Sequence, residues 1–325
     1  MLKNMWYAVL NAKEVKNNKP LKAKRFGKDL VFWRNTKGEI ICLDDICPHR
    51  GVSLSLGKIN NNCIACPFHG FEFNEEGKCT FIPANGKDFP ISSKYATKSY
   101  ELKEEYGFIW FWYGEEQENY PKIEFFDFLD EKFSYSTTYQ DTFNTHFTRC
   151  VENQLDVSHL AFVHSKTIGK GGRSLVNGPL VEFENNTIKI WVDNKKQGEK
   201  RITLDKDLQF LKTNKASLEF RFPNIWSLRI SDSFYGFLAF APQDEENTVL
   251  YMRFYQKIVT VPLLKEIFNL VNGIFSKKIL NEDKNIILTH FPKNSLLAKE
   301  EKLTRSDLPI TIFRKIMRNE SLEIK

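Results

Sequence analysis

The sequence has few cysteines, no block of like charge and no long apolar segment. Six cysteines in 325 residues are far below the density of a disulfide-stabilised secreted domain, so we expect free thiols or metal ligands. The net charge of +6 is spread along the chain without a long Lys/Arg run, and a nucleic-acid partner is therefore not expected. No apolar stretch reaches the roughly 20 near-continuous residues of a membrane-spanning helix. The start of the chain carries no secretory signal pattern, so we expect a cytoplasmic protein.

The sequence contains enough apolar material for two domains. Hydrophobic residues make up 42% of the chain and aromatic residues 14%, and a domain usually takes about 150 residues. Short strand-like runs separated by Gly, Asn and Asp turns occupy residues 1–113 and predict a small all-β domain. The polar, acidic segment 114–121 ends in proline and is the predicted linker.

The predicted second domain, residues 122–325, mixes strands and helices. An antiparallel sheet is expected from strand-like runs at 181–192, 216–230, 233–241 and 248–259. One helix is expected within 151–164, and another begins at Pro262 and continues to about His290. We interpret the apolar stretch 259–275 as an amphipathic face that packs on the core rather than as a membrane contact. The fold class is therefore expected to be α+β, with the small all-β domain first and the sheet-plus-helices domain after it.

Two cysteine–histidine pairs lie in the predicted small domain. Cys47-Pro-His49 is followed, after 16 intervening residues, by Cys66-Pro-Phe-His69. A [2Fe–2S] centre of the Rieske kind needs two thiolates on one iron and two imidazoles on the other, and this pattern supplies both. Structural zinc is the alternative, because Cys63 and Cys66 also form a Cys-x-x-Cys pair. The Cys-x-His spacing is closer than zinc pairs usually are, which favours the iron–sulfur cluster.

A second group of ligand-type residues lies further along the chain. Asp156 and His159 are three residues apart, so on a helix they share a face and the carboxylate could accept the second N–H of the imidazole. His159 and His164 are five apart, which separates them on a regular helix unless it ends or bulges between them. Two histidines and a carboxylate form the facial triad of non-haem Fe(II) sites, which leaves positions open for O2. Glu282 or Asp283 could supply the carboxylate, and spacing alone does not choose between them.

Together these motifs resemble a Rieske non-haem iron oxygenase, the oxygenase (alpha) component of ring-hydroxylating and demethylating systems. The resemblance covers nearly the whole chain, and the length of the chain favours the compact type, similar to vanillate demethylase, over the larger dioxygenases. The motifs that carry it are Asn4-Met-Trp-Tyr7, Cys47-Pro-His-Arg-Gly51, Cys66-Pro-Phe-His-Gly70, Asn153-x-x-Asp156-x-x-His159-x4-His164, Glu282-Asp283, Ser306-Asp307 and Phe313-Arg314.

The resemblance implies the ligands of both metal centres. The implied cluster ligands are Cys47 and Cys66 on one iron and His49 and His69 on the other. The mononuclear iron would be bound by His159, His164 and Asp283, since the second residue of the family's Glu-Asp pair is the ligand. Members of the family form ring-shaped homotrimers. In them, an aspartate equivalent to Asp156 bridges a cluster histidine of one subunit, here His69, and an iron histidine of the next.

One position departs from the family pattern. Relatives commonly carry Gln seven residues after the ligand aspartate, where this chain has His290. Seven helical residues fall about 20° short of two turns, so His290 is expected to face the same way as Asp283. We interpret it as a solvent-facing or capping histidine, and a role around the iron is the alternative. Asn153 is a second candidate for the surroundings of the iron ligands.

The activity implied by the resemblance is monooxygenation, as hydroxylation or oxidative demethylation, of a small aromatic or cyclic substrate. O2 would be the co-substrate, and NAD(P)H would supply electrons indirectly, through a flavin reductase or a ferredoxin. cis-Dihydroxylation of a ring is the alternative among oxygenases. Outside that class, the alternatives are an electron-transfer Rieske protein, against which the iron triad argues, and a zinc-stabilised binding protein, which would be colourless.

Overall fold

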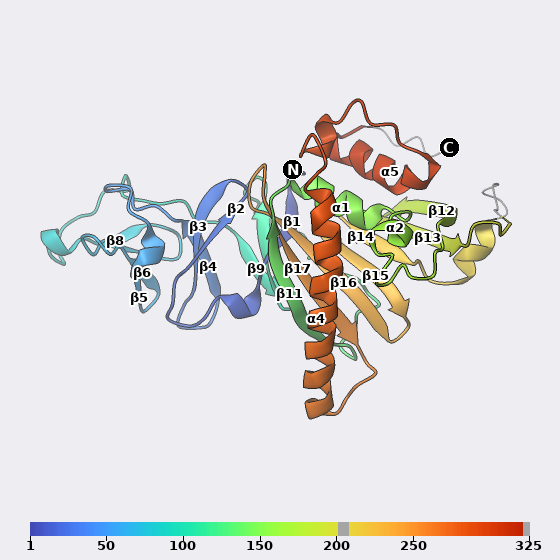
Figure 1. Ribbon diagram of the computed structural model, residues 1–325. Helices are drawn as coiled ribbons and strands as arrows, with labels where there is room; N and C mark the ends of the chain where they lie inside the picture. Colours follow the sequence, from blue (N-terminus) through green and yellow to red (C-terminus); the bar gives the residue numbers. More distant parts are fainter. Residues whose placement is uncertain (201–207, 321–325) are drawn as a thin grey trace. The chain divides into compact units, whose positions relative to one another are not determined.

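The computed structural model describes residues 1–200 and 208–320, and the chain divides into two compact units (Figure 1). The amino-terminal unit comprises Lys3–Ile123 and Pro242–Asp244, and the carboxy-terminal unit comprises Met1–Leu2, Glu124–Ala241 and Glu245–Lys325. The predicted linker 114–121 lies inside the amino-terminal unit, where Trp6 donates a hydrogen bond to the carbonyl of Pro121 (2.9 Å). The division into 1–113, 114–121 and 122–325 stays a prediction.

The amino-terminal unit is built from short antiparallel strands. They form three small sheets with the orders β1-β10-β9, β2-β3-β4 and β5-β6-β7-β8. The strands are β1 (Met5–Asn11), β2 (Leu21–Arg25), β3 (Lys28–Arg34), β4 (Ile40–Asp44), β5 (Lys58–Asn60), β6 (Cys63–Ala65), β7 (Glu72–Phe73), β8 (Cys79–Phe81), β9 (Leu102–Glu105) and β10 (Phe108–Tyr113). The small all-β domain expected from the sequence is thus confirmed.

Strand β3 divides the core of this unit into two clusters. Because side chains alternate along a strand, Leu30 and Phe32 point to one side and Val31 and Trp33 to the other. The first pair packs with residues of β1 and β10. The second pair belongs to the cluster that also contains the two motif cysteines. The apolar core therefore surrounds the sulfur atoms of the candidate cluster site.

The carboxy-terminal unit is a seven-stranded sheet with the order β11-β17-β16-β15-β14-β13-β12, covered by helices. Its strands are β11 (Ser134–Phe143), β12 (Leu175–Glu184), β13 (Thr187–Lys195), β14 (Leu218–Arg221), β15 (Ile225–Ser231), β16 (Phe234–Pro242) and β17 (Thr248–Gln256). In the part of the unit that the structure describes, the helices are α1 (Phe147–Leu155), α2 (Leu160–Val163), α4 (Pro262–Ile287) and α5 (Leu308–Met317). The paired strands are antiparallel, so the α+β class is confirmed.

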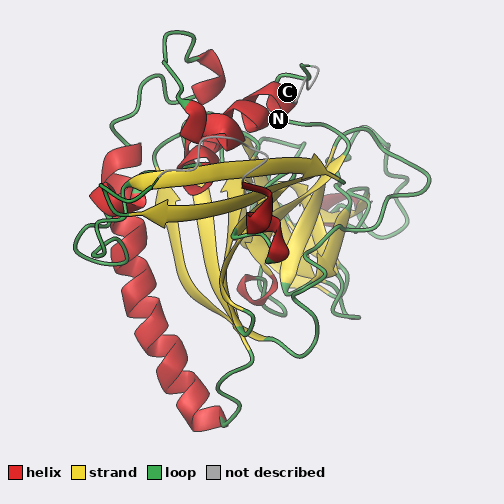
Figure 2. Ribbon diagram, turned by 90° about the vertical axis from the view of Figure 1, so that its right-hand side faces the viewer, coloured by secondary structure: helices red, strands yellow, loops and turns green. Residues whose placement is uncertain are grey.

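Helices cover one face of this sheet (Figure 2). Phe268 of α4 packs edge-on against Phe234 of β16, with ring centroids 5.7 Å apart. The next residue along β16, Tyr235, points to the opposite face, where Phe128 stacks on it at 4.9 Å. The segment before β11 therefore covers the face that the helices leave open.

Two predicted strands proved to be hairpins. The run expected at 181–192 holds the end of β12 and the start of β13, which turn at Asn185 and Asn186. Both asparagines have positive φ values (48° and 57°), the conformation that two-residue hairpins require. The run at 216–230 likewise contains β14 and β15. The prediction missed these turns because neither contains a glycine.

Both predicted helices also differ in extent from the structure. The segment 151–164 is not one helix, since α1 ends at Leu155 and α2 is a single turn beginning at Leu160. Helix α4 begins at Pro262 as expected but ends at Ile287, so it does not reach His290. A third prediction, that the apolar face of 259–275 packs on the core, is wrong, because this face is exposed apart from Phe268, which packs on Phe234. Helix periodicity shows which residues share a face, but not which way the face points.

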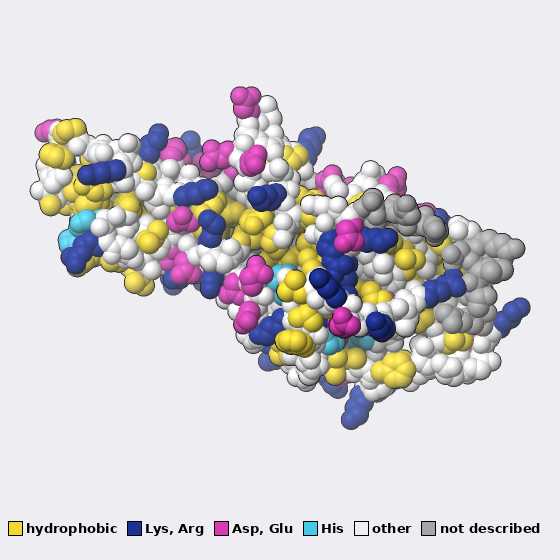
Figure 3. All heavy atoms as spheres, turned by 90° about the horizontal axis from the view of Figure 1, so that it is seen from above, with side chains coloured by type: hydrophobic (Ala, Val, Ile, Leu, Met, Phe, Trp, Pro, Cys, Tyr) yellow, Lys and Arg dark blue, Asp and Glu magenta, His cyan; other side chains and the backbone are white. Residues whose placement is uncertain are grey.

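The distribution of charged side chains and the hydropathy of the helices agree with the expectations from the sequence. On the face that Figure 3 shows, Lys and Arg side chains are interspersed with Asp and Glu rather than gathered in one block. No helix in residues 1–200 and 208–320 is long and apolar enough to cross a membrane. The cytoplasmic location stays a prediction.

Burial of His146 makes the stability of the carboxy-terminal unit pH-dependent. His146 caps α1, where its Nδ1 accepts a hydrogen bond from the Thr148 N–H. Burial lowers the pKa of His146 from 6.5 to about 4, so the unfolded chain binds a proton more readily than the folded one. The free energy of unfolding should fall by about 2 kcal/mol between about pH 7 and pH 5 from this group. Urea unfolding at the two pH values, monitored by tryptophan fluorescence, measures this difference in the free energy of unfolding.

His146→Asn is the matched variant, because asparagine keeps a capping acceptor but does not titrate. Between the two pH values, the free energy of unfolding of the variant should fall by about 2 kcal/mol less than that of the original chain. Equal losses in both proteins would show that His146 titrates normally in the folded state.

Candidate functional site

The two cysteine–histidine motifs form matching loops in the amino-terminal unit. In the first, the Cys47 N–H donates to the Val52 carbonyl (2.8 Å) and the Cys47 carbonyl accepts from Gly51 (2.9 Å). In the second, Cys66 repeats the pattern with Phe71 (2.8 Å) and Gly70 (3.0 Å). Both glycines have φ values in the left-handed region, +75° and +72°, which lets each loop turn back within two residues of its histidine.

The two loops place their thiols inside and their imidazoles outside. Cys47 and Cys66 are buried, at 2% and 4% exposure, whereas His49 and His69 are exposed. The two imidazole rings lie 4.8 Å apart between centroids, and His49 stacks on Phe71. Burial, together with the neighbouring Cys66 thiol, raises the pKa of the Cys47 thiol to about 11. The structure thus brings together the four predicted cluster residues, in an arrangement that suits two thiolates on an inner iron and two imidazoles on an outer one.

A second convergence lies in the carboxy-terminal unit. His159, His164 and Asp283 each direct one potential ligand atom to a common point, and these atoms lie within 4.8 Å of one another. His159 immediately precedes the single turn of α2 and His164 immediately follows it. Because the chain makes only this one turn, the two rings approach to 5.3 Å between centroids despite their five-residue spacing. This is the helix break that the sequence required.

Hydrogen bonds fix the direction in which both imidazoles present their free nitrogen. Nδ1 of His159 lies 3.0 Å from the backbone carbonyl of Asp156, and Nδ1 of His164 lies 2.8 Å from the Glu282 carboxylate. A proton on each Nδ1 leaves the Nε2 lone pairs unprotonated. The two Nε2 atoms lie 3.6 Å and 3.0 Å from the Asp283 carboxylate oxygen Oδ1. That oxygen is buried and accepts no hydrogen bond of good geometry within the described residues. The three groups therefore fit a cation.

The carboxylates adjust the charge of this site. Burial by itself would lower the pKa of His164, but the carboxylates of Asp283 and Glu282 outweigh it and raise the pKa overall. Burial opposes ionisation of Glu282 too, yet hydrogen bonds from Thr167 and His164 lower its pKa. Ionised carboxylates beside imidazoles create a site that attracts a divalent cation.

The structure separates the roles of Glu282 and Asp283, which spacing could not do. Asp283 is 2% exposed and faces the two histidines. Glu282 binds the far nitrogen of His164 and the Thr167 hydroxyl (2.7 Å) instead. Sequence reasoning missed this role of Glu282, and its only signal was the pair of adjacent carboxylates.

Asp156 lies next to His159 but contacts it differently from the prediction. Its backbone carbonyl, not its carboxylate, is within hydrogen-bond distance of His159 Nδ1. The carboxylate oxygen Oδ1 accepts from the N–H (2.6 Å) and hydroxyl (2.7 Å) of Ser158, and Oδ2 lies 3.8 Å from His159. Asp156 follows the last residue of α1 and has an extended backbone, so the expected shared helix face does not exist. Its side chain remains 27% exposed.

The two other candidates lie in different surroundings. Asn153 is buried on α1, and its Nδ2 has no hydrogen-bond partner within the described residues. His290 is exposed and lies in the turn after α4, where its N–H donates to the Ile287 carbonyl (3.1 Å). The expectation that His290 continues the helix face of Asp283 is therefore wrong. A solvent-facing histidine agrees with its exposure.

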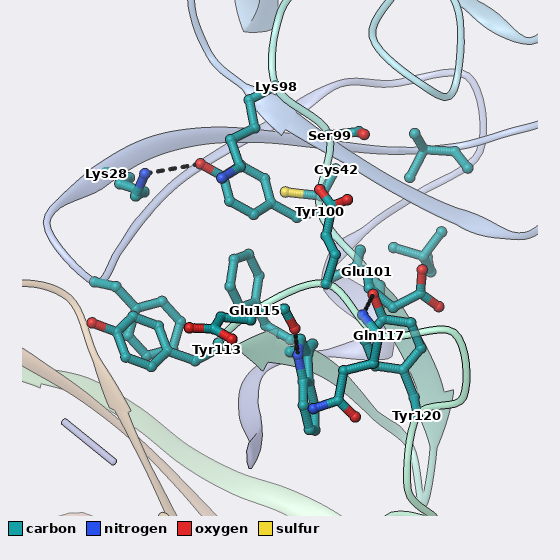
Figure 4. Close-up of a pocket in the computed structure, with 18 of the residues that line it drawn as sticks. Lys28, Cys42, Lys98, Ser99, Tyr100, Glu101, Tyr113, Glu115, Gln117 and Tyr120 are labelled. Atoms are coloured by element: carbon teal, nitrogen blue, oxygen red, sulfur yellow. Dashed lines mark hydrogen bonds between the residues drawn. The ribbon is translucent and has the colours of Figure 1, made fainter. Parts of the chain in front are cut away.

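Two cavities lie away from these residues. One of about 740 Å³ in the amino-terminal unit contains Tyr100, which accepts a hydrogen bond from Lys28 (3.0 Å) (Figure 4). Another of about 320 Å³ lies on the sheet face of Tyr235. Neither is lined by a candidate ligand of either metal site. A substrate pocket between the sheet and α4 stays a prediction.

Comparison with known proteins matches both parts of the chain to family models. Residues 5–101 match the family model of the Rieske [2Fe-2S] domain, and residues 143–320 match that of the vanillate O-demethylase oxygenase C-terminal domain. The chain is 32% identical over 174 residues to aminopyrrolnitrin oxygenase PrnD of Pseudomonas fluorescens, covering 50% of this chain and 46% of that protein. It is 32% identical over 171 residues to the vanillate O-demethylase oxygenase subunit of Pseudomonas sp. (strain HR199 / DSM 7063), covering 52% and 46%. The chain thus spans about half the length of these curated relatives.

Solved structures share the fold along nearly the whole chain. NdmA of Pseudomonas putida CBB5 superposes with a TM-score of 0.78 at 22% identity, covering 97% of this chain and 89% of that one. Dicamba monooxygenase bound to dicamba superposes with a TM-score of 0.77 at 17% identity, covering 98% of this chain and 97% of that one. The C-terminal family model alone covers more than half of the chain, and the Rieske model precedes it. The chain therefore belongs to the Rieske non-haem iron oxygenases, a family that carries a Rieske [2Fe–2S] cluster and a mononuclear iron.

Proposed function

We propose that this chain is the oxygenase component of a monooxygenase system that hydroxylates or demethylates a small ring-containing compound. The observation that carries the proposal is the convergence of His159 Nε2, His164 Nε2 and the Asp283 carboxylate at a buried point. The same chain holds the paired Cys-Pro-His and Cys-Pro-Phe-His loops. An electron-transfer protein would need only the second feature.

The proposed ligands follow the geometry of the two sites. The buried thiolates of Cys47 and Cys66 would hold one cluster iron, and the exposed imidazoles of His49 and His69 the other. His159, His164 and Asp283 would hold the mononuclear iron. When bound, the two centres supply one-electron transfer and O2 activation. The protein's own contribution is to hold the imidazole tautomers, keep the site buried and admit the substrate.

Glu282 and the carbonyl of Asp156 act as positioning groups. Each accepts the Nδ1 proton of one histidine, which keeps Nε2 aimed at the Asp283 carboxylate. Such outer partners fix ring orientation and make the imidazole more basic. Thr167 donates to Glu282 and holds it in this position.

Asp156 also has a proposed role between subunits. We expect a homotrimer in which its carboxylate bridges His69 of one subunit and His159 of the next. The partial exposure of the Asp156 side chain and the exposure of His69 support this role. Electrons would come from a ferredoxin or a flavin reductase that uses NAD(P)H.

The names of the relatives support a ring-containing substrate, although chlorophyllide a oxygenase and cholesterol 7-desaturase are named for larger ring systems. Two curated relatives are named for aminopyrrolnitrin and vanillate, and two solved neighbours hold caffeine and dicamba. Methyl ethers and N-methyl compounds of this size are the first substrates to test.

The direct test is anaerobic purification followed by metal analysis, a visible spectrum and a turnover assay with a reductase. We expect about three irons per chain, a brown colour that dithionite bleaches, and O2-dependent loss of a methyl group or gain of a hydroxyl group. A colourless zinc protein would contradict the proposal. A product with two new hydroxyl groups would show that the reaction is cis-dihydroxylation rather than monooxygenation.

Glu282→Gln should weaken the mononuclear site without touching the cluster. Loss of the charged acceptor for His164 should reduce Fe(II) affinity about 10- to 100-fold. Competition with a chelator, under anaerobic conditions, measures that affinity, and the visible spectrum reports the cluster. Glu266→Gln on the exposed part of the same helix is the control and should change neither. Unchanged affinity in Glu282→Gln would show that the hydrogen bond to His164 does not position the ligand.

Asp156→Asn should separate electron transfer from metal binding. The backbone carbonyl that orients His159 is retained, so iron and cluster content should stay normal. Reduction of the iron through the cluster should be lost, and turnover with it. Normal product formation by this variant would rule out Asp156 as the bridge.

A further inference from the structure

Helix α4 turns its apolar face away from the protein. Seven apolar side chains spaced three and four residues apart form a single stripe, which we call the outer stripe: Leu263, Leu264, Ile267, Leu270, Val271, Ile274 and Phe275. Their exposures run from 44% at Phe275 to 72% at Leu263. A surface helix of a globular protein normally buries such a stripe. Exposed apolar patches of this extent usually mark an interaction site.

The opposite face of the same helix turns inward and mixes apolar groups (Phe268, Leu280 and Ile287) with polar ones. Ser276 and Asp283 are buried there, and Asn272 is partly buried. The Asn272 amide donates to the Phe268 carbonyl (2.7 Å), and the Ser276 hydroxyl donates to the Asn272 carbonyl (2.5 Å). These polar groups are satisfied by their own helix, so the inward orientation is stable. The helix cannot rotate to bury the outer stripe, since Asp283 on its other side must face inward.

The charges around the outer stripe are mostly positive. Residues 257–278 contain four lysines and one glutamate, a net charge of +3. Lys277 and Lys278 are exposed at one end of the stripe, and Lys257 is exposed just before its other end. Basic residues that border an apolar helical face are typical of helices that bind anionic lipid surfaces.

The shape of this region suits a lipid surface better than a protein groove. The amino-terminal end of α4 extends past the end of the sheet that it covers (Figures 1 and 2). The segment leading into it adds Ile258 and Val261, which are 56% and 53% exposed. A projecting apolar edge can enter the boundary between lipid headgroups and acyl chains, to a depth of about 5–10 Å.

We propose that the outer stripe inserts into the surface of an anionic lipid bilayer and attaches the protein to it peripherally. The apolar side chains would enter the interface, while the bordering lysines contact the headgroup phosphates. This inference does not depend on the proposed oxygenase activity, because it rests on the exposed half of α4 alone. It replaces the interpretation of this stretch as a core-packing helix.

The test is flotation of the metal-containing protein with lipid vesicles. Vesicles of equal parts phosphatidylcholine and phosphatidylglycerol should carry the protein upward, and added salt should weaken the binding. The double variant Leu270→Glu/Ile274→Glu should lose at least about tenfold in affinity, since two charges would replace inserted apolar groups. Leu297→Glu is the matched control, because Leu297 is 65% exposed but lies outside the stripe. It should bind normally.

Lys277→Gln/Lys278→Gln tests the electrostatic part separately. Each lysine near an anionic surface contributes about 1 kcal/mol, so binding to the mixed vesicles should weaken about thirtyfold. Binding to pure phosphatidylcholine should change little. Metal content and circular dichroism establish that each variant is folded.

Two results would overturn the proposal. The first is absence of flotation with the mixed vesicles at low salt. The second is a concentration-dependent oligomer in size-exclusion chromatography that Leu270→Glu/Ile274→Glu dissociates, which would show that another copy of the chain covers the stripe.

Discussion

The buried carboxylate of Asp283 is the group on which the candidate iron site depends. At 2% exposure, an ionised carboxylate needs positive charge nearby. Two imidazole nitrogens face the same oxygen, and an oxygen acceptor at each Nδ1 leaves these Nε2 atoms as lone-pair donors, so the imidazoles do not supply that charge themselves. A divalent metal ion among these three groups would compensate the carboxylate. The single turn of α2 and the inward face of α4 are what make this geometry possible.

The sequence predicted the chemistry of the sites better than their backbone. The Cys47-Pro-His49 and Cys66-Pro-Phe-His69 patterns predict a cluster site without any knowledge of the fold, because the residue types and their close spacing are sufficient. The structure adds that each loop turns at a glycine with positive φ. For His159 and His164, helix geometry showed that a break was needed, and α2 is that break. The resemblance selected Asp283 over Glu282, and only side-chain contacts explain what Glu282 does.

The wrong predictions share one cause: each concerns a feature that the local sequence does not determine. The hairpin at Asn185 and Asn186 was missed because two asparagines replaced the usual glycine. The extent of the last long helix was overestimated, so His290 was placed on a helix face that does not exist. The orientation of α4 was wrong because periodicity cannot tell an inward stripe from an outward one. Here the requirement to bury Asp283 decides the orientation, and the apolar stripe is exposed as a consequence.

The measurement that tests the central claim most directly is the iron content of Asp283→Ala, purified without oxygen beside the unaltered chain. The account predicts loss of about one of three irons per chain while the reduced-cluster spectrum stays the same. It predicts this because Asp283 contributes to one site only, and the cysteine–histidine loops form the other. Retention of all the iron, or loss of the cluster together with the mononuclear iron, would contradict the account.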